Sequence, residues 1–403
     1  MRKLILPCIG MAIALASCGG GSDSGSGLRQ LGLTTAIPGV GTGTNFSFDL
    51  GVVLGNRYYV TDRNNASVDV FDTATSAFVT QIKGTGANAF AGLTSSTSTS
   101  GPDGINVVGN LLYVGDVNSV KVIDPALQQV VKTIVVGNTG KRADEGCTDS
   151  VHGLYMIGSP DVDIPFATFI DTKTQTVVAQ VTFNDTTGAA SGGLEQCRYD
   201  AATDAFYVNN DGSTDNPRGE LDVIPGGSIR AIAPGTTVNF TALAGGKKYT
   251  LGKCDPTGLA IGPGNDIAVN CREGTAGEPL LVQILDKTNG AILASVNAGG
   301  GDQLEYDASS NRYYGASNRW TATGKAGVNG ACSATSPCTP VLAVIDAATR
   351  TVVALLPSGN NAHSVAVDPV TGKAFLPASS GTSPGGCATC GTEPAELLTF
   401  ATR

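Results

Sequence analysis

Residues 344–353 read Val-Ile-Asp-Ala-Ala-Thr-Arg-Thr-Val-Val, and this stretch decides the fold because versions of it return along the chain. In each version a β-rich run ends in Asp, a small polar turn follows, and a second β-rich run begins. The aspartate lies at positions 72, 124, 171, 286 and 346, and a degenerate copy covers Leu221-Asp222-Val223-Ile224. Each copy predicts a strand, a turn and a strand.

A second phrase precedes the first and consists of an apolar strand, a Gly or Asn turn and a Tyr-containing strand. Its copies cover residues 55–60, 109–114, 204–208, 311–314 and 372–376, with further copies at 154–156 and 267–269. Together the two phrases predict four strands per unit and seven units. Four-stranded units of roughly 40 to 50 residues are typical of propeller blades, and the excess length falls in Gly-, Ser- and Pro-rich loops.

The expected fold is therefore all-β, a seven-bladed β-propeller of four-stranded antiparallel blades over residues 30–403. The seventh unit begins near His363, ends at residues 397–400 and is one strand short. Residues near 31–37 could supply that strand and close the ring, which would remove an exposed sheet edge. An irregular β-sandwich is the alternative.

Two segments carry a resemblance to a known family. Tyr58-Tyr59-Val60-Thr61-Asp62 with Val68-Asp69-Val70-Phe71-Asp72, and residues 363–376, resemble repeats of the YVTN family of seven-bladed propellers. That family is related to NHL and lactonase-like propellers. The resemblance covers about residue 30 to the end and implies a fold rather than a reaction.

The composition suits short strands and tight turns. The 403 residues include 54 Gly, only 15% are charged, and the net charge is −9. Because an acidic chain repels phosphates, nucleic acid is not an expected partner.

The first residues predict export and lipid attachment. Arg2 and Lys3 precede an apolar run that is too short to span a bilayer. Leu15-Ala16-Ser17-Cys18 resembles the bacterial lipobox, which implies a signal peptide over 1–17 and a lipid on Cys18, with a Gly/Ser tether over 18–29. By resemblance to Gram-negative lipoproteins, Gly19 in place of Asp implies the outer membrane, with the propeller periplasmic or surface-exposed. An ordinary signal peptide that happens to contain Cys is the alternative.

The remaining cysteines predict disulfides, because eight are left after Cys8 and Cys18 and the expected compartment is oxidising. Cys254 and Cys271 flank an apparent hairpin. The pairs Cys332 with Cys338 and Cys387 with Cys390 would close small loops, which leaves Cys147 with Cys197. The last small loop is also a C-x-x-C, so redox or metal chemistry is an alternative to a structural disulfide there.

Candidate site residues come from aligning the seven units at the start of each innermost strand. That column is Asp49, Asp103, Glu145, Glu195, Thr257, Asp302 and His363. Like charges crowded at one channel mouth repel unless a cation neutralises them. Asp103, Glu145, Glu195 and Asp302 are thus expected ligands for Ca²⁺ or another divalent cation, or contacts for a small cationic ligand. The alternative is that these acids bond backbone amides around a solvated channel.

Other residues give weaker signals. His363 is the catalytic candidate, as a general base beside the carboxylates. The oxygen-rich loop at residues 209–216 only loosely resembles a calcium loop, and Trp320 could stack on a ring ligand or pack a loop. The glycines of 299–302 lack the spacing of a nucleotide-binding turn, and His152 lacks the context of a hydrolase triad.

Two functional hypotheses follow. The first is a lipid-anchored binding or scaffold protein at the outer membrane, which uses its loop face and an acidic channel mouth to hold an envelope protein or a small ligand. The second, implied by the resemblance, is a metal-dependent lactonase-like hydrolase with the metal in the central channel; the asparagine ligands of that family have no clear counterparts here. A purely structural envelope protein is a third possibility.

Overall fold

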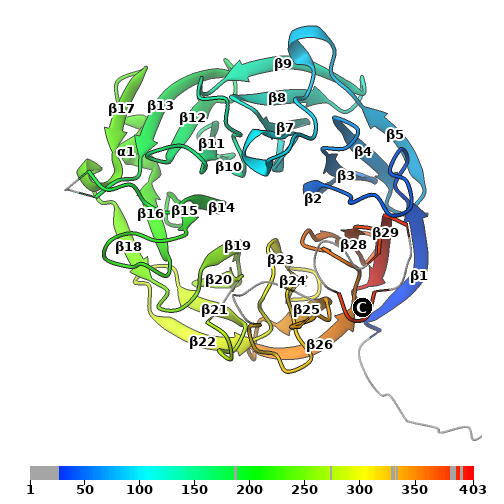
Figure 1. Cartoon of the computed structure of the whole chain (residues 1–403). Coiled ribbons are helices and arrows are strands. Elements are labelled where there is room, and N and C mark those ends of the chain that lie inside the picture. The colour runs from blue at the N-terminus through cyan, green and yellow to red at the C-terminus, as the bar shows by residue number, and fades with distance from the viewer. Residues whose placement is uncertain are drawn as a thin grey trace, which may run out of the picture.

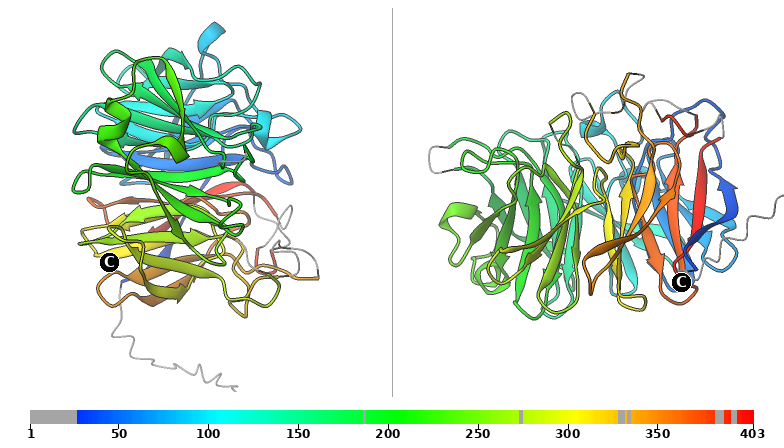
Figure 2. Two further views of the ribbon diagram at one scale, coloured as in Figure 1. Left: turned by 90° about the vertical axis from the view of Figure 1, so that its left-hand side faces the viewer. Right: turned by 90° about the horizontal axis from the view of Figure 1, so that it is seen from below.

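Seven β-sheets stand around a central channel in the computed structural model, as Figure 1 shows face-on and Figure 2 shows from two sides. The structure describes residues 27–185, 188–272, 275–327, 332, 335–381, 387–390 and 394–403. The predicted signal peptide, Cys18 and most of the tether lie outside the described residues. The prediction of a seven-bladed propeller is confirmed.

Each blade is an antiparallel sheet whose first strand lies innermost. Blades 1 and 2 consist of β2 (Phe48–Leu54), β3 (Arg57–Asp62), β4 (Ser67–Asp72) and β5 (Phe78–Ile82), and of β6 (Ile105–Val108), β7 (Leu111–Asp116), β8 (Ser119–Asp124) and β9 (Gln129–Val135). Blades 3 and 4 contain β10 (Gly146–Asp149), β11 (Leu154–Ser159), β12 (Phe166–Asp171) and β13 (Thr176–Thr182), and β14 (Leu194–Asp200), β15 (Ala205–Asn210), β16 (Glu220–Pro225) and β18 (Lys247–Thr250). Blades 5 and 6 contain β19 (Pro256–Ile261), β20 (Asp266–Cys271), β21 (Leu281–Asp286) and β22 (Ile292–Asn297), and β23 (Leu304–Asp307), β24 (Arg312–Ser317), β25 (Val341–Asp346) and β26 (Thr351–Pro357).

The seventh blade is assembled from both ends of the described chain. It contains β27 (Ala366–Asp368), β28 (Lys373–Ala378), β29 (Glu396–Ala401) and β1 (Arg29–Ala36), in the order β1-β29-β28-β27. β1 pairs antiparallel with β29, from Arg29 opposite Ala401 to Ala36 opposite Glu396. Closure by an N-terminal strand is thus confirmed, and the strand begins one residue before the predicted start of the propeller.

One insertion departs from the repeat. Between β16 and β18 the chain forms α1 (Gly226–Arg230), β17 (Thr236–Asn239) and the 3₁₀ turn η3 (Phe240–Ala242) at the outer rim (Figure 1). β17 pairs in parallel with β13, so that blade 3 gains a fifth strand from the segment that belongs to blade 4. The other short 3₁₀ turns, η1 (Gly86–Asn88) and η2 (Thr97–Thr99), lie between blades 1 and 2.

The repeated aspartate has a structural reason. Asp171 Oδ1 accepts hydrogen bonds from the backbone N–H groups of Lys173 and Thr174, at 3.0 and 2.7 Å, and so folds the turn between β12 and β13. Gln175, four residues after Asp171, has φ of +55°, a left-handed conformation that this turn requires. Positive φ also occurs four residues after each of the other repeat aspartates, at Ser76, Gln128, Gly290 and Arg350.

Apolar packing lies between neighbouring blades. The repeated tyrosines of the second strands are fully buried and include Tyr58, Tyr113, Tyr155, Tyr207 and Tyr313. Tyr113 meets Tyr155 of the next blade edge-on at 5.1 Å between ring centroids, and Tyr58 stacks on Phe375 across the junction of blades 1 and 7. Aromatic pairs of this kind add to the free energy of burial, so the repeated Tyr holds adjacent blades together.

Within the described residues the eight propeller cysteines form four disulfides, in the predicted pairs. These are Cys147–Cys197, Cys254–Cys271, Cys332–Cys338 and Cys387–Cys390. The first joins the innermost strands of blades 3 and 4. In the part of the chain described, no helix has both the length and the hydrophobicity needed to cross a membrane.

Candidate functional site

The seven aligned residues lie where the innermost strands begin. Three of them, Asp49, Glu195 and Thr257, are the second residues of strands β2, β14 and β19. The other four, Asp103, Glu145, Asp302 and His363, lie shortly before β6, β10, β23 and β27. All innermost strands start at the same end of the channel, so these side chains gather at one mouth. Five of the seven are carboxylates, which the structure divides into two groups. The other two are Thr257 and His363.

The first group, called here the carboxylate triad, is Glu145, Glu195 and Asp302. One carboxylate oxygen from each lies within 4.8 Å of the other two. Glu145 is only 4% exposed, and among the described residues Glu145 Oε2 and Asp302 Oδ1 are buried without a hydrogen-bond partner. Buried carboxylate oxygens without partners are costly, so the triad is suited to a proton or a cation.

The second group consists of Asp49, Asp103 and Asp144, and arginines compensate its charge. Asp103 Oδ1 accepts from both Nε and Nη2 of Arg63, at 3.0 and 2.5 Å, and Arg142 Nη2 lies 2.8 Å from Asp144 Oδ2. Asp103 was expected to bind metal together with the triad residues. It does not join them, because its carboxylate is fully buried against Arg63.

Arginines, which the sequence analysis did not place there, also reach the channel mouth beside the carboxylates. A cavity of about 290 Å³ at this mouth is lined by Arg63, Arg142, Arg272 and Arg319, together with Asp302. Arg272 Nη1 lies 3.5 Å from Glu195 Oε1. The mouth thus combines carboxylates with guanidinium groups.

Sequence reasoning missed these arginines because they lie outside the aligned column. Arg63 and Arg272 directly follow the second strands β3 and β20. Asn318, the residue that directly follows β24, lines the same cavity. An alignment column at that position would have identified both arginines.

Burial and mutual repulsion raise the pKa of the triad carboxyls. The pKa of Glu145 lies well above its ordinary value, first because of burial and then because of the negative charges of Asp302 and Asp144. Burial also raises the pKa of Glu195, and Arg272 offsets part of that effect. For Asp103, burial outweighs the two arginines and raises the pKa to about 7. A divalent cation would favour the ionised forms that burial disfavours.

His363 is held in one orientation at the same cavity. Its ring stacks on Phe48, with 4.2 Å between centroids and 13° between planes, and Nδ1 lies 2.7 Å from the carbonyl oxygen of Asn361. A carbonyl only accepts, so Nδ1 carries a proton. In the neutral ring Nε2 is then the nitrogen with a free lone pair, as a general base requires.

Thr257, the uncharged residue of the column, has a structural role. Its hydroxyl lies 2.8 Å from the carbonyl oxygen of Gly301 and 3.2 Å from that of Asn270, and the residue is fully buried. The side chain therefore ties blade 5 to the segment that precedes blade 6.

The other sequence candidates have internal roles. In the loop at residues 209–216, Ser213 and Asn216 both donate to Glu220 Oε2, so these groups stabilise the loop itself. Trp320 is 9% exposed and packs against Leu280 and Val341, which favours the loop-packing alternative over stacking on a ligand.

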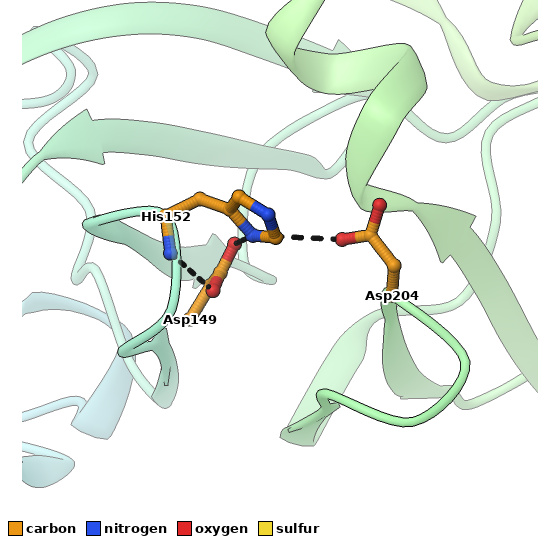
Figure 3. Close-up of side chains that lie close together, drawn as sticks. All are labelled: Asp149, His152 and Asp204. Atoms are coloured by element: carbon orange, nitrogen blue, oxygen red, sulfur yellow. Dashed lines mark hydrogen bonds and ion pairs between the residues drawn. The ribbon is translucent and has the colours of Figure 1, made fainter.

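A separate cluster lies at the opposite ends of the strands. His152 Nδ1 is 2.9 Å from Asp149 Oδ2 and 3.7 Å from Asp204 Oδ1 (Figure 3). Arg230 also contacts both aspartates. Its single positive charge compensates part of the charge of the two carboxylates. Asp149 Oδ1 also accepts from the backbone N–H groups of Val151 and His152, so the cluster stabilises this turn.

Comparison with known proteins supports the architecture. No protein-family profile matches the chain, and no curated protein matches its sequence. A chain in the crystal structure of the mitotic checkpoint complex is similar over 99% of both chains, with a TM-score of 0.59 and 11% identity. The WD40 β-propeller domain of Doa1 is similar over 93% of this chain and 97% of that one, with a TM-score of 0.57 and 10% identity. These likenesses show the propeller fold alone.

Proposed function

We propose that the protein is a binding propeller that holds a divalent cation at the carboxylate triad. The observation that carries this proposal is the convergence of Glu145, Glu195 and Asp302, together with the unpartnered buried oxygens of Glu145 and Asp302. Three carboxylates from three blades form a hard, all-oxygen ligand set, which suits Ca²⁺ better than softer metals. The bound cation would link blades 3, 4 and 6 across the channel.

The loop face around this mouth is the proposed interaction surface. The cavity next to the triad carries arginines as well as acids, so a partner or ligand would meet both signs of charge. Binding through a propeller face also agrees with the similarity to a chain that belongs to a multiprotein complex. We propose an envelope protein as the partner, because Leu15-Ala16-Ser17-Cys18 predicts a lipid anchor at the outer membrane.

Metal content tests the proposal directly. The full chain carrying Cys18→Ser, which removes the lipid attachment site, is purified and analysed by elemental mass spectrometry and by thermal melts with and without EDTA. We expect one divalent ion per chain and a lower Tm in EDTA. Glu195→Gln and Asp302→Asn should each abolish metal retention, whereas Asp222→Asn, at a buried carboxylate away from the mouth, should retain it. A metal-free chain with an unchanged melt would exclude this function.

A lactonase-like hydrolase is the second candidate, and His363 is the observation that favours it. Its Nε2 is the free ring nitrogen, and its side chain lines the cavity together with Asp302. A cation at the triad would polarise a substrate carbonyl, and His363 would take a proton from water. Lactone hydrolysis that is lost both in EDTA and in His363→Gln supports this candidate. Cation binding without hydrolysis would support only the binding role.

A further inference from the structure

The other end of the channel contains a second cavity, of about 230 Å³, that the triad does not reach. Its lining comes from residues farther along the innermost strands of blades 1, 2, 3, 4 and 6. Gln196 and Arg198 follow Glu195 on β14, and Glu305 follows Asp302 by three residues. Since all these strands run in the same direction along the channel, residues farther along them place this cavity toward the opposite end from the cation site.

One of the side chains that line this cavity, Gln196, has an unused hydrogen-bond donor. Gln196 is 1% exposed, and its Oε1 accepts a 2.6 Å hydrogen bond from the backbone N–H of Leu259. That bond fixes the orientation of the amide and leaves Nε2 buried without a partner among the described residues. A buried amide nitrogen without an acceptor costs free energy, which an acceptor on a ligand would recover.

The charged groups of this cavity are fixed and balanced. Arg198 Nη2 lies 3.3 Å from Glu305 Oε1, and Gln303 Nε2 donates to the same oxygen at 3.2 Å. Gln303 itself is held by Ser364, whose hydroxyl donates to Gln303 Oε1 at 2.6 Å. One positive and one negative side chain in a prearranged pair favour a neutral ligand with both donors and acceptors.

The remaining lining is apolar or aromatic. Leu50, Val52, Ile105 and Val107 come from blades 1 and 2, and Tyr199 adds a ring from blade 4. The cavity is smaller than the roughly 300–1,000 Å³ of pockets for drug-sized ligands. The cavity wall thus has a polar part and an apolar part. A small ring with hydroxyls at its edge and C–H groups on its faces would match both.

We propose that this end of the channel binds a neutral polyhydroxyl ligand of monosaccharide size, through Gln196, Arg198 and Glu305. Gln196 Nε2 donates to one ligand oxygen. The Arg198–Glu305 pair engages neighbouring hydroxyls as donor and acceptor, and the apolar wall covers a sugar face. This site is independent of the cation site.

Calorimetry on the full Cys18→Ser chain in EDTA tests this proposal without any contribution from the triad. The probes are glucose, galactose, mannose and arabinose, with glycine, glutamate and inorganic phosphate as ligands of other charge. We expect at least one sugar to bind with one site per chain and the charged ligands not to bind. Absence of sugar binding with a Kd below about 10 mM, or preferential binding of an amino acid or phosphate, overturns the proposal.

Matched variants locate the binding. Gln196→Glu keeps the acceptor for Leu259 and removes the donor, so it should weaken sugar binding by at least about tenfold. Glu305→Gln, at a less buried position, should do the same and carries the test if Gln196→Glu does not fold. Gln283→Glu alters a buried glutamine of β21 outside the channel and should change affinity by less than about twofold. Unchanged sugar binding in both channel variants overturns the assignment to this cavity.

Discussion

Arg63 binds Asp103 through two of its nitrogens on a single carboxylate oxygen, with both side chains almost completely buried. The pair joins the end of β3 in blade 1 to the start of β6 in blade 2. Asp49 lies 3.4 Å from the same guanidinium. The arginine therefore compensates more than one carboxylate at the channel wall.

Loss of this arginine should be strongly destabilising. Arg63→Gln leaves Asp103 and Asp49 buried without their main counter-charge, and removal of one partner of a buried pair costs about 3–5 kcal/mol. Urea unfolding at neutral pH measures the free energy of unfolding. The control is Arg57→Gln, at the partly exposed Arg57–Asp72 pair, where the expected loss is below about 1 kcal/mol. Equal losses in both variants would contradict this assignment.

Cation binding at the triad should weaken as pH falls from neutral. The raised pKa values of Glu145 and Glu195 mean that protons compete with the cation well above pH 4.5, the ordinary value for Glu. Burial is the largest cause of both shifts; the charges of Asp302 and Asp144 raise the pKa of Glu145 further, and Asp211 raises that of Glu195, which Arg272 and Arg142 oppose. Calcium titrations at pH values between neutral and about 4.5 measure how the affinity changes. A pH-independent affinity would show that the triad is not the ligand set.

The folding stability of the metal-free protein should depend on pH in the opposite sense to cation binding. Because the folded pKa of each triad glutamate lies above the unfolded value, the folded state takes up protons more readily than the unfolded state does. Its stability in EDTA should therefore rise as pH falls through these folded pKa values and level off below the unfolded value of about 4.5. Glu145→Gln removes one of the titrating groups and should flatten this dependence in thermal melts.

At a repeat aspartate, the pH dependence of folding stability should have the opposite sign. Hydrogen bonds from Thr174 and Lys173 lower the pKa of Asp171. The stabilisation is then present above the unfolded pKa and is lost as pH falls through the lower folded value. Asp171→Ala should cost about 1 kcal/mol at neutral pH and progressively less in acid. Asp163→Ala, at a residue that accepts no such turn bonds within the described part of the chain, provides the comparison in urea unfolding.

The disulfide between blades should matter more than the smallest one. Cys147–Cys197 spans 50 residues and joins two blades, whereas Cys387–Cys390 spans 3. Replacement of the first pair by alanine should destabilise the chain by about 2–5 kcal/mol, because the unfolded chain gains more freedom when a longer loop is released. Replacement of the second pair should cost less. The reverse order in thermal unfolding would contradict this expectation.

The sequence predicted the repeat and the closing strand because both depend on local signals. Asp171 and its equivalents fold turns within a few residues, and Tyr113 marks a buried second strand. β17 was not predicted, since its partner is β13, more than fifty residues earlier, and only the tertiary fold brings them together.

The candidate site was predicted in part for a similar reason. The start of each inner strand placed Glu145, Glu195 and Asp302 at one mouth. Spacing along the chain could not show that Asp103 turns to Arg63, because that contact depends on side-chain directions in two different blades. Gln196 was also missed, since its role depends on the one atom that its bond to Leu259 leaves unused.

The pairing of β1 with β29 has a mechanical consequence for a chain that is held at its N-terminal end. Arg29 lies opposite Ala401, so the first residue of the closing strand is also the outermost rung of the ladder. Tension applied ahead of Arg29 and directed away from the ring would load that rung first and open the ladder one rung at a time. Such unzipping needs far less force than shearing all rungs together, so the strand that completes the ring is also where pulling would open it.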